Sequence, residues 1–279
     1  MEQSNLILKN WLQQEKNFID NLLISRRCPT RKSVHDLRVA VKRLRSYLRF
    51  KEQLTNENWK DSFAKVKTLF QSIGKLRDFD MSLLLVRKHE RKEKLSLLHF
   101  KEYLVVNKSL TRRWTKQDSI KFNEQEISVF RQKFNLGLTK EEIIQKIFEF
   151  SATKIRKAKR LSNHFKKNAH EIRKLVKDAY YWLKICPEEL VKKFIDIATM
   201  HRMLNYLGNW QDCFILAEKL DHYSKDLPKK NEEKEMLKQL KKKLEEDQDI
   251  LLERAIKSWD KIEIKKATKL VALSAASPD

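Results

Sequence analysis

One sequence pattern occurs twice in this chain, and the duplication constrains the fold more than any other feature. Residues 34–49 read VHDLRVAVKRLRSYLR, and residues 169–184 read AHEIRKLVKDAYYWLK. The two segments share a histidine and several cationic and apolar residues at the same spacing. These pairs are His35 and His170, Arg38 and Arg173, Val41 and Val176, Lys42 and Lys177, and Leu48 and Leu183. A self-similar segment at a long period indicates one supersecondary unit used twice.

Both copies are predicted to be α-helices that carry a row of cations. Neither copy contains glycine or proline, and apolar residues recur at helical spacing. On a helical wheel the histidine and the cations of each copy fall on one arc beside the apolar stripe. The first row is His35, Arg38, Lys42, Arg45 and Arg49, and the second contains His170, Arg173, Lys177 and Lys184. Like charges at this spacing repel by roughly a few tenths of a kcal/mol per pair. An anion along the rows would offset that repulsion, so we favour an anion site over a solvated basic face.

The composition favours an all-helical, basic protein. Only three glycines and four prolines occur among 279 residues, which argues for helices with short connections. Lysine and arginine exceed aspartate and glutamate by 61 to 38, a net charge of +23, and a field of this sign attracts polyanions. The three cysteines fit neither a zinc site nor a disulfide framework, and no signal peptide or membrane-spanning run occurs. We therefore expect a cytoplasmic protein without a membrane partner.

Helical periodicity and breaking residues divide the chain into eight predicted helices. The predicted ranges are 3–26, 31–54, 57–88 and 93–117, then 140–162, 167–185, 188–222 and 231–258. Residues 118–139 are predicted to connect the two sets, and residues 261–279 to form a C-terminal tail. This predicts a single domain over 1–260 that contains two repeats.

A second internal match supports the duplication and adds a candidate ligand. FQSIGKLRDFDMSLL aligns with LNYLGNWQDCFILAE at nearly the same offset. The match pairs Gly74 with Gly208 and Asp78 with Asp212. Glycine costs about 1 kcal/mol inside a helix relative to alanine, so its recurrence predicts a shared backbone requirement such as a kink or a close helix crossing. Arg77 in this motif is a further candidate ligand for an anion.

The motifs HDLRVAVKRLR and SIGKLRDFD, with weaker partners AHEIRKLVK and YLGNWQD, resemble those of the CHAD family, the conserved-histidine α-helical domain. The resemblance extends over roughly residues 5–260. It implies an all-α fold of two pseudo-symmetric four-helix bundles, over about 1–117 and 140–260, around a central basic cavity. It also implies that this cavity binds inorganic polyphosphate. We expect this binding to be non-catalytic and to need no cofactor, and association with polyphosphate granules is one expected consequence.

The resemblance further implies which residues bind the anion. They are His35, Arg38, Lys42, Arg45, Arg49, His170, Arg173, Lys177 and Lys184. We add Arg77, and Lys157 from the dense basic run 154–160, of which one or two residues are expected to face the cavity. In the second copy Asp178 occupies the position of Arg43, so the second wall is expected to be less cationic.

Two other classes of non-enzymatic protein remain open. A nucleic-acid-binding helical protein would fit the charge, although no helix-turn-helix, zinc-finger or RNA-reading signature occurs. The six tryptophans could stack on bases, but they lie one per predicted helix on helices with apolar stripes, which favours core positions. A helical scaffold for a protein partner is the third hypothesis, and it predicts no anion preference at physiological salt.

Enzymatic and metal-binding functions are disfavoured by the motifs. The pair His35-Asp36 is typical of metal phosphohydrolases, but Asp36 points about 100° away from His35 on the wheel. The second copy has Glu171 in place of the aspartate, and no other histidine has metal-ligand spacing. No phosphate-binding loop or hydrolase motif occurs. We expect no catalytic residue, no metal and no cofactor.

Overall fold

The structure, a computed structural model, describes residues 6–130, 137–225, 227–228, 231 and 233–265. The regular elements in these ranges are helices, and no strand occurs among them, so the predicted all-α class is confirmed. The helices are α1 (Leu6–Arg27), α2 (Arg31–Thr55), α3 (Ala64–Glu93), α4 (Leu98–Lys121), α5 (Gln125–Ser128), α6 (Lys140–Leu161), α7 (Phe165–Leu183), α8 (Glu188–Phe194), α9 (Ile197–Lys225) and α10 (Glu233–Trp259). None of the helices in this part of the chain is long and apolar enough to span a membrane.

The helix predicted over 188–222 is interrupted, for a local reason. Ile195 adopts an extended backbone after α8. The Asp196 carboxylate then accepts hydrogen bonds from the backbone N–H groups of Ala198 and Thr199, at 2.9 and 3.0 Å. Because an aspartate in this position satisfies N–H groups that the first helical turn leaves free, α9 begins there as a separate helix.

Three other segments differ in detail from the prediction. The helix predicted over 57–88 begins only at Ala64, after a loop in which Trp59 packs edge to face on Phe63. The predicted connector 118–139 includes the end of α4 and the short helix α5. In the predicted tail, Ile262 is buried, and the N–H of residue 265 donates to the carbonyl of residue 194. Residues beyond 265 lie outside the described ranges.

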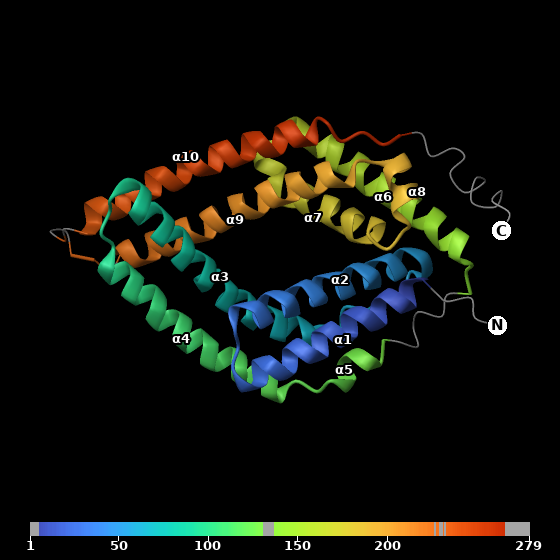
Figure 1. Ribbon diagram of the computed structural model, residues 1–279, viewed down its shortest axis with the longest axis horizontal. Helices are drawn as coiled ribbons and strands as arrows, with labels where there is room; N and C mark the ends of the chain where they lie inside the picture. The colour runs from blue at the N-terminus through green and yellow to red at the C-terminus, as the bar shows by residue number, and fades with distance from the viewer. Residues whose placement is uncertain (1–5, 131–136, 226, 229–230, 232, 266–279) are drawn as a thin grey trace.

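The long helices pack in pairs of chain neighbours. The pairs are α1 with α2, α3 with α4, α6 with α7, and α9 with α10 (Figure 1). Between the two halves of the chain, α2 packs against α7 and α3 packs against α9. The two helices that carry the repeated pattern therefore lie next to each other.

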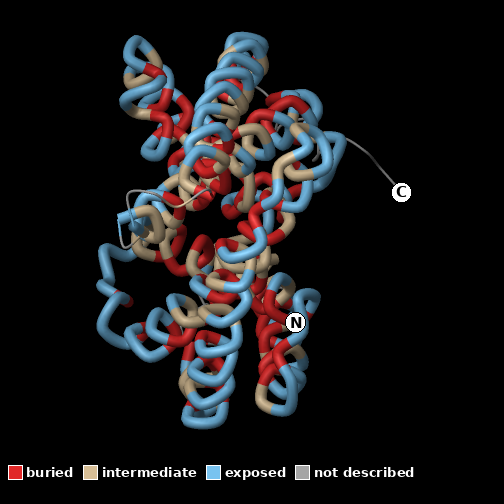
Figure 2. Tube along the Cα trace, turned by 90° about the vertical axis from the view of Figure 1, so that its left-hand side faces the viewer, coloured by how far each residue is buried: buried red, intermediate tan, exposed pale blue. Residues whose placement is uncertain are grey.

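The buried apolar side chains form two clusters, and each cluster draws on both halves of the chain. The larger cluster joins α1 and α2 to α6 and α7 and includes Trp11 and Trp182. The smaller lies where the α3–α4 pair meets the α9–α10 pair, and it includes Phe100 and Leu216. Figure 2 shows the buried residues inside the molecule and the exposed ones on the outer helix faces. The two separate four-helix bundles are therefore not confirmed, because the core does not divide between the halves.

A buried hydrogen bond links the two halves directly. The indole N–H of Trp182 on α7 donates to the carbonyl of Ser46 on α2 at 2.8 Å, and Phe50 packs edge to face on the same ring. Four tryptophans are buried, namely Trp11, Trp59, Trp182 and Trp259. The expectation that most tryptophans belong to the core is confirmed, although the side chain of Trp114 is 57% exposed.

Candidate anion-binding cavity

The two predicted cationic rows face each other across one cavity. The cavity has a volume of 450 Å³ and lies between α2 and α7, with α3 and α9 completing its wall. Eight of the eleven predicted site residues line it. They are Arg38, Lys42, Arg45, Arg49, Arg77, His170, Arg173 and Lys177. The helical wheel thus identified side chains that come together from three helices of both halves. We call this space the central cavity.

Three predicted site residues lie elsewhere. His35 near the start of α2, Lys184 at the end of α7, and Lys157 on α6 are exposed. These three side chains line neither the central cavity nor the two cavities that adjoin it. A helix advances about 1.5 Å per residue, so a row that spans several turns can extend past the cavity at its ends. His35 and His170 are therefore equivalent in the sequence repeat, but only His170 lines the central cavity.

Other residues at the site were not among those predicted. Lys174 and Tyr181 of α7 line the central cavity, and Lys154 of α6 lines the adjoining one. Lys154 lies three residues after Ser151 and four before Ala158, both of which are buried. The buried stripe of α6 was thus a signal in the sequence that favours Lys154 over its neighbours in the basic run.

Each glycine of the internal match lies near an arginine that lines the central cavity. A Cβ atom at Gly74 would lie against the guanidinium of Arg38, and one at Gly208 would lie near the guanidinium of Arg173. Only at Gly74 is the approach too close for a Cβ atom, so the space beside the helix explains the glycine at 74 and not the one at 208.

Two equivalent lysines meet at the centre of the cavity. Burial, together with the charges of Lys177 and Arg38, lowers the pKa of Lys42 to about 5. Burial and the charge of Arg173 lower the pKa of Lys177 to about 7, while a hydrogen bond with Lys42 acts in the opposite direction. Desolvation penalises a buried ammonium, and nearby cations add to the penalty. An anion placed here would relieve both effects.

Phe70 of α3 supports two of the arginines. The guanidinium carbons of Arg38 and Arg45 lie 4.8 and 5.5 Å from the centroid of its ring, a range in which cations are attracted to an aromatic face. Burial lowers the pKa of both guanidinium groups, but arginine remains charged because its intrinsic pKa is so high. These two positive charges are therefore permanent and held in place.

Two ion pairs connect the halves across the cavity. The guanidinium of Arg49 on α2 donates to the carboxylate of Asp178 on α7 at 2.6 Å. The guanidinium of Arg77 on α3 donates two hydrogen bonds to the carboxylate of Asp212 on α9, one of them at 2.8 Å. Burial acts to lower the pKa of Arg77, but the hydrogen bonds and the charge of Asp212 raise it overall. Both carboxylates line the central cavity.

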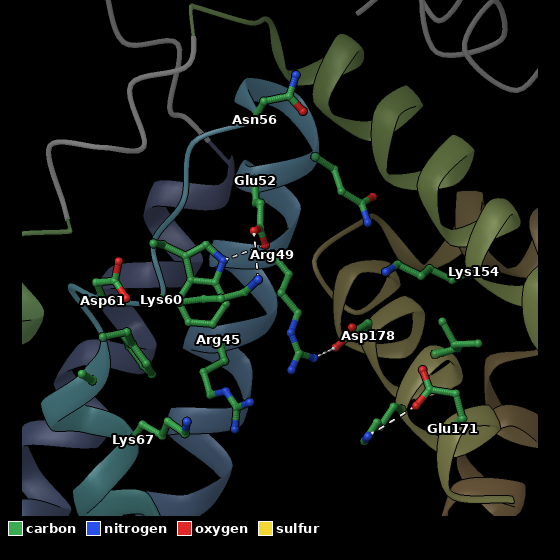
Figure 3. Close-up of a pocket in the computed structure, with 16 residues that line it drawn as sticks. Arg45, Arg49, Glu52, Asn56, Lys60, Asp61, Lys67, Lys154, Glu171 and Asp178 are labelled. Atoms are coloured by element: carbon green, nitrogen blue, oxygen red, sulfur yellow. Dashed lines mark hydrogen bonds and ion pairs between the residues drawn. The ribbon is translucent and has the colours of Figure 1, made fainter. Parts of the chain in front are cut away.

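A further cavity adjoins the central cavity on each side along α2, with lining residues in common. A cavity of 810 Å³ shares Arg45, Arg49 and Asp178 with it. Figure 3 shows this space, with Arg49 directed toward Asp178 and Lys154 on the facing wall. A third cavity, of 610 Å³, shares Arg38 with the central one. The three spaces therefore follow one another in the order of the residues on α2, from Arg49 to Arg38.

The arrangement suits a ligand with several negative charges in a line. Charged hydrogen bonds from arginine are short and strong, and the flat guanidinium can bind two oxygens of one phosphate. Within the described residues no group of three or more histidine, cysteine, aspartate or glutamate side chains could hold a metal ion.

Fold and cavity together define an all-helical protein whose duplicated helices line a basic cavity. The family model of the CHAD domain matches residues 8–221. The chain therefore belongs to the CHAD family, as its motifs indicated, and this family is linked in general to polyphosphate binding.

A solved structure agrees with this assignment. The crystal structure of the CHAD domain from the plant Ricinus communis superposes with a TM-score of 0.72 and 16% sequence identity, over 95% of this chain and 93% of that chain. At that identity the similarity extends to the fold alone. No curated protein matches the sequence.

Proposed function

We propose that this protein binds inorganic polyphosphate in the central cavity and catalyses no reaction on it. The observation that carries the proposal is the convergence of two equivalent cationic rows on one space of 450 Å³. Eight arginine and lysine side chains line that space, compared with three carboxylates. The proposal includes a cytoplasmic location and no cofactor, with association with polyphosphate granules as a consequence.

The shape of the site favours this ligand. Polyphosphate is a flexible, unbranched chain with about one charge per phosphate and no base to be read, so its recognition resembles binding of a nucleic-acid backbone. Three cavities in succession along α2 suit an extended chain of such groups. A base-paired duplex is too bulky to enter the central cavity and could contact only its openings.

A competition titration at physiological salt tests the proposal. Labelled long-chain polyphosphate would be bound first and then displaced by unlabelled polyphosphate, single-stranded nucleic acid or duplex DNA, each matched for total charge. We expect polyphosphate to compete far better than either nucleic acid. Equal competition by nucleic acid would instead support the alternative function, a general nucleic-acid binder. An absence of any polyanion binding at this salt concentration would favour a scaffold for a protein partner.

A further inference from the structure

The central cavity contains buried negative charges as well as positive ones. Asp178 and Asp212 are only 8% and 6% exposed, and both line the cavity. Each is bonded to an arginine of the other half, Asp178 to Arg49 and Asp212 to Arg77. A carboxylate in an anion site opposes binding, because it repels the ligand and occupies a donor that the ligand needs.

The two carboxylates relate differently to the sequence repeat. Asp178 occupies the position that Arg43 has in the first copy. Asp212 does have a counterpart, Asp78, but both aspartates hold the same arginine, because Arg77 also lies 3.4 Å from Asp78. Asp178 and Asp212 of the second half are therefore the carboxylates that bond cations of the first half across the cavity.

The two pairs lie at different ends of the central cavity. Arg49 and Asp178 also line the 810 Å³ cavity, so this pair is at the boundary between the two spaces. Arg77 and Asp212 line only the central space, where Arg77 is beside Asp78, a residue of the 610 Å³ cavity. A chain that runs through all three spaces would pass both pairs.

We propose that Asp178 and Asp212 are internal competitors of the ligand, which hold Arg49 and Arg77 in the free protein and release them to phosphate. This inference rests on the proposed function and specifies how the same site limits its own affinity. In the free protein each guanidinium is already bonded to a carboxylate, so a phosphate must replace that carboxylate in order to bind. The side chains of Arg49 and Arg77 are 33% and 28% exposed, so a phosphate can approach each guanidinium while the carboxylate is still bonded to it.

The exchange has a measurable consequence for affinity. In the parent protein, an arginine–carboxylate bond is lost for each arginine–phosphate bond formed. With a neutral amide in place of the carboxylate, the arginine–phosphate bond replaces a weaker arginine–amide bond. The repulsion between carboxylate and phosphate is also removed. A charge-assisted hydrogen bond contributes about 1.5–3 kcal/mol. If a variant recovers about half of this free energy, its affinity rises by about tenfold.

The test compares two isosteric variants with a charge-matched control. Asp178→Asn and Asp212→Asn each remove one carboxylate from the cavity. Asp249→Asn makes the same change in net charge at an exposed site, where the carboxylate binds Lys166 at 2.8 Å. Polyphosphate affinity of the full chain would be measured at several salt concentrations. We expect each cavity variant to bind about tenfold more tightly than the control, with a plot of log affinity against log salt steeper by about one.

Each outcome bears on the proposal. If both cavity variants bind as the Asp249→Asn control does, or more weakly, the carboxylates do not compete and the inference is wrong. If a variant is unfolded alone but folds when polyphosphate is added, as followed by circular dichroism, the carboxylate substitutes for the ligand and the inference is supported. If both stay unfolded with polyphosphate, the pairs are structural only, which overturns it. Failure of the parent protein to bind polyphosphate would reject the proposed function itself.

Discussion

The guanidinium of Arg38 occupies the space that a side chain at Gly74 would need. A Cβ atom built on Gly74 would lie 2.6 Å from Nη1 of Arg38, far inside van der Waals contact. The obstructing atom is the end of a flexible side chain, so arginine and not the backbone would move. The glycine of α3 therefore leaves room for an arginine of α2 that lines the central cavity.

Gly74→Ala should weaken ligand binding without destabilising the protein. Alanine gains about 1 kcal/mol of helix propensity over glycine, and this offsets the loss of the contact between Arg38 and the Phe70 ring. We expect the free energy of unfolding to change by less than about 1 kcal/mol. Displacement of Arg38 should lower polyphosphate affinity by about tenfold. Chemical denaturation and a binding titration of the same preparation measure both effects.

Gly208→Ala is the matched control. Its Cβ atom would lie 3.7 Å from the guanidinium of Arg173, an ordinary contact distance. This variant should be more stable by about 0.5–1 kcal/mol and should bind as the parent does. Equal loss of affinity in both variants would show that the close approach at Gly74 is not what positions Arg38.

Removal of the charges on α2 should abolish most of the binding. Arg38, Lys42 and Arg45 all line the central cavity, and charge-assisted contacts contribute about 1.5–3 kcal/mol each. The triple alanine variant should therefore lose several kcal/mol of binding free energy, by about the sum of these terms. The fold should persist because the variant removes two like charges and a buried lysine whose pKa is lowered to about 5 by burial and by neighbouring cations. Circular dichroism and the competition titration provide the two measurements.

The three predicted site residues that lie outside the cavities provide the comparison for this variant. His35, Lys157 and Lys184 belong to the same motif rows or basic run but are exposed. A combined alanine variant of these residues removes two lysine charges and should lower affinity only a little, through the long-range field. If it binds as weakly as the α2 variant does, the cavity is not the site.

The sequence predicted the direction of the rows because helical periodicity alone sets which side chains share a face. Arg38 and Lys42, or Arg173 and Lys177, need no tertiary information to be placed on one side of a helix. The length of the cavity does need it, and for this reason His35 was predicted to line the cavity although it does not. Periodicity gives an angle around the axis, whereas burial along the axis depends on neighbouring helices.

The two ion pairs across the cavity could not be predicted from the sequence for a similar reason. Arg77 and Asp212 are separated by 135 residues, and Arg49 and Asp178 by 129. The internal match aligned Asp212 with Asp78 and gave no hint that both would bind Arg77. Such a pairing follows from the packing of α3 against α9, which no local pattern encodes.

Trp182→Phe should loosen the contact between the halves. Its indole N–H bonds the Ser46 carbonyl at 2.8 Å inside the core, and phenylalanine would lose this bond and leave part of the space empty. We expect the free energy of unfolding in urea to fall by about 1–3 kcal/mol. The exposed Trp114→Phe is the control and should stay within about 0.5 kcal/mol of the parent. Equal effects would mean that the bond between α7 and α2 contributes nothing specific.

Polyphosphate binding should strengthen as the pH falls. Lys42 and Lys177 have pKa values lowered to about 5 and about 7 in the free fold, whereas an unfolded lysine has a pKa of about 10.4. Between these values the unfolded chain binds more protons, so the free protein gains stability as the pH rises through this window. A bound anion restores the charge on both lysines, so binding takes up protons. Affinity should therefore be at least about tenfold higher near pH 6.5 than near pH 8.5.

Two variants decide whether the lysine pair is responsible. Lys42→Met with Lys177→Met removes both titrating groups, so the pH dependence should flatten even if the affinity is lower throughout. His170→Gln keeps the lysines while removing another titratable side chain of the same cavity, and it should retain the pH dependence. Calorimetry in two buffers of different ionisation enthalpy would count the protons taken up. A pH dependence that follows His170 instead of the lysines would contradict the prediction, because the lysines would then be charged before the anion arrives.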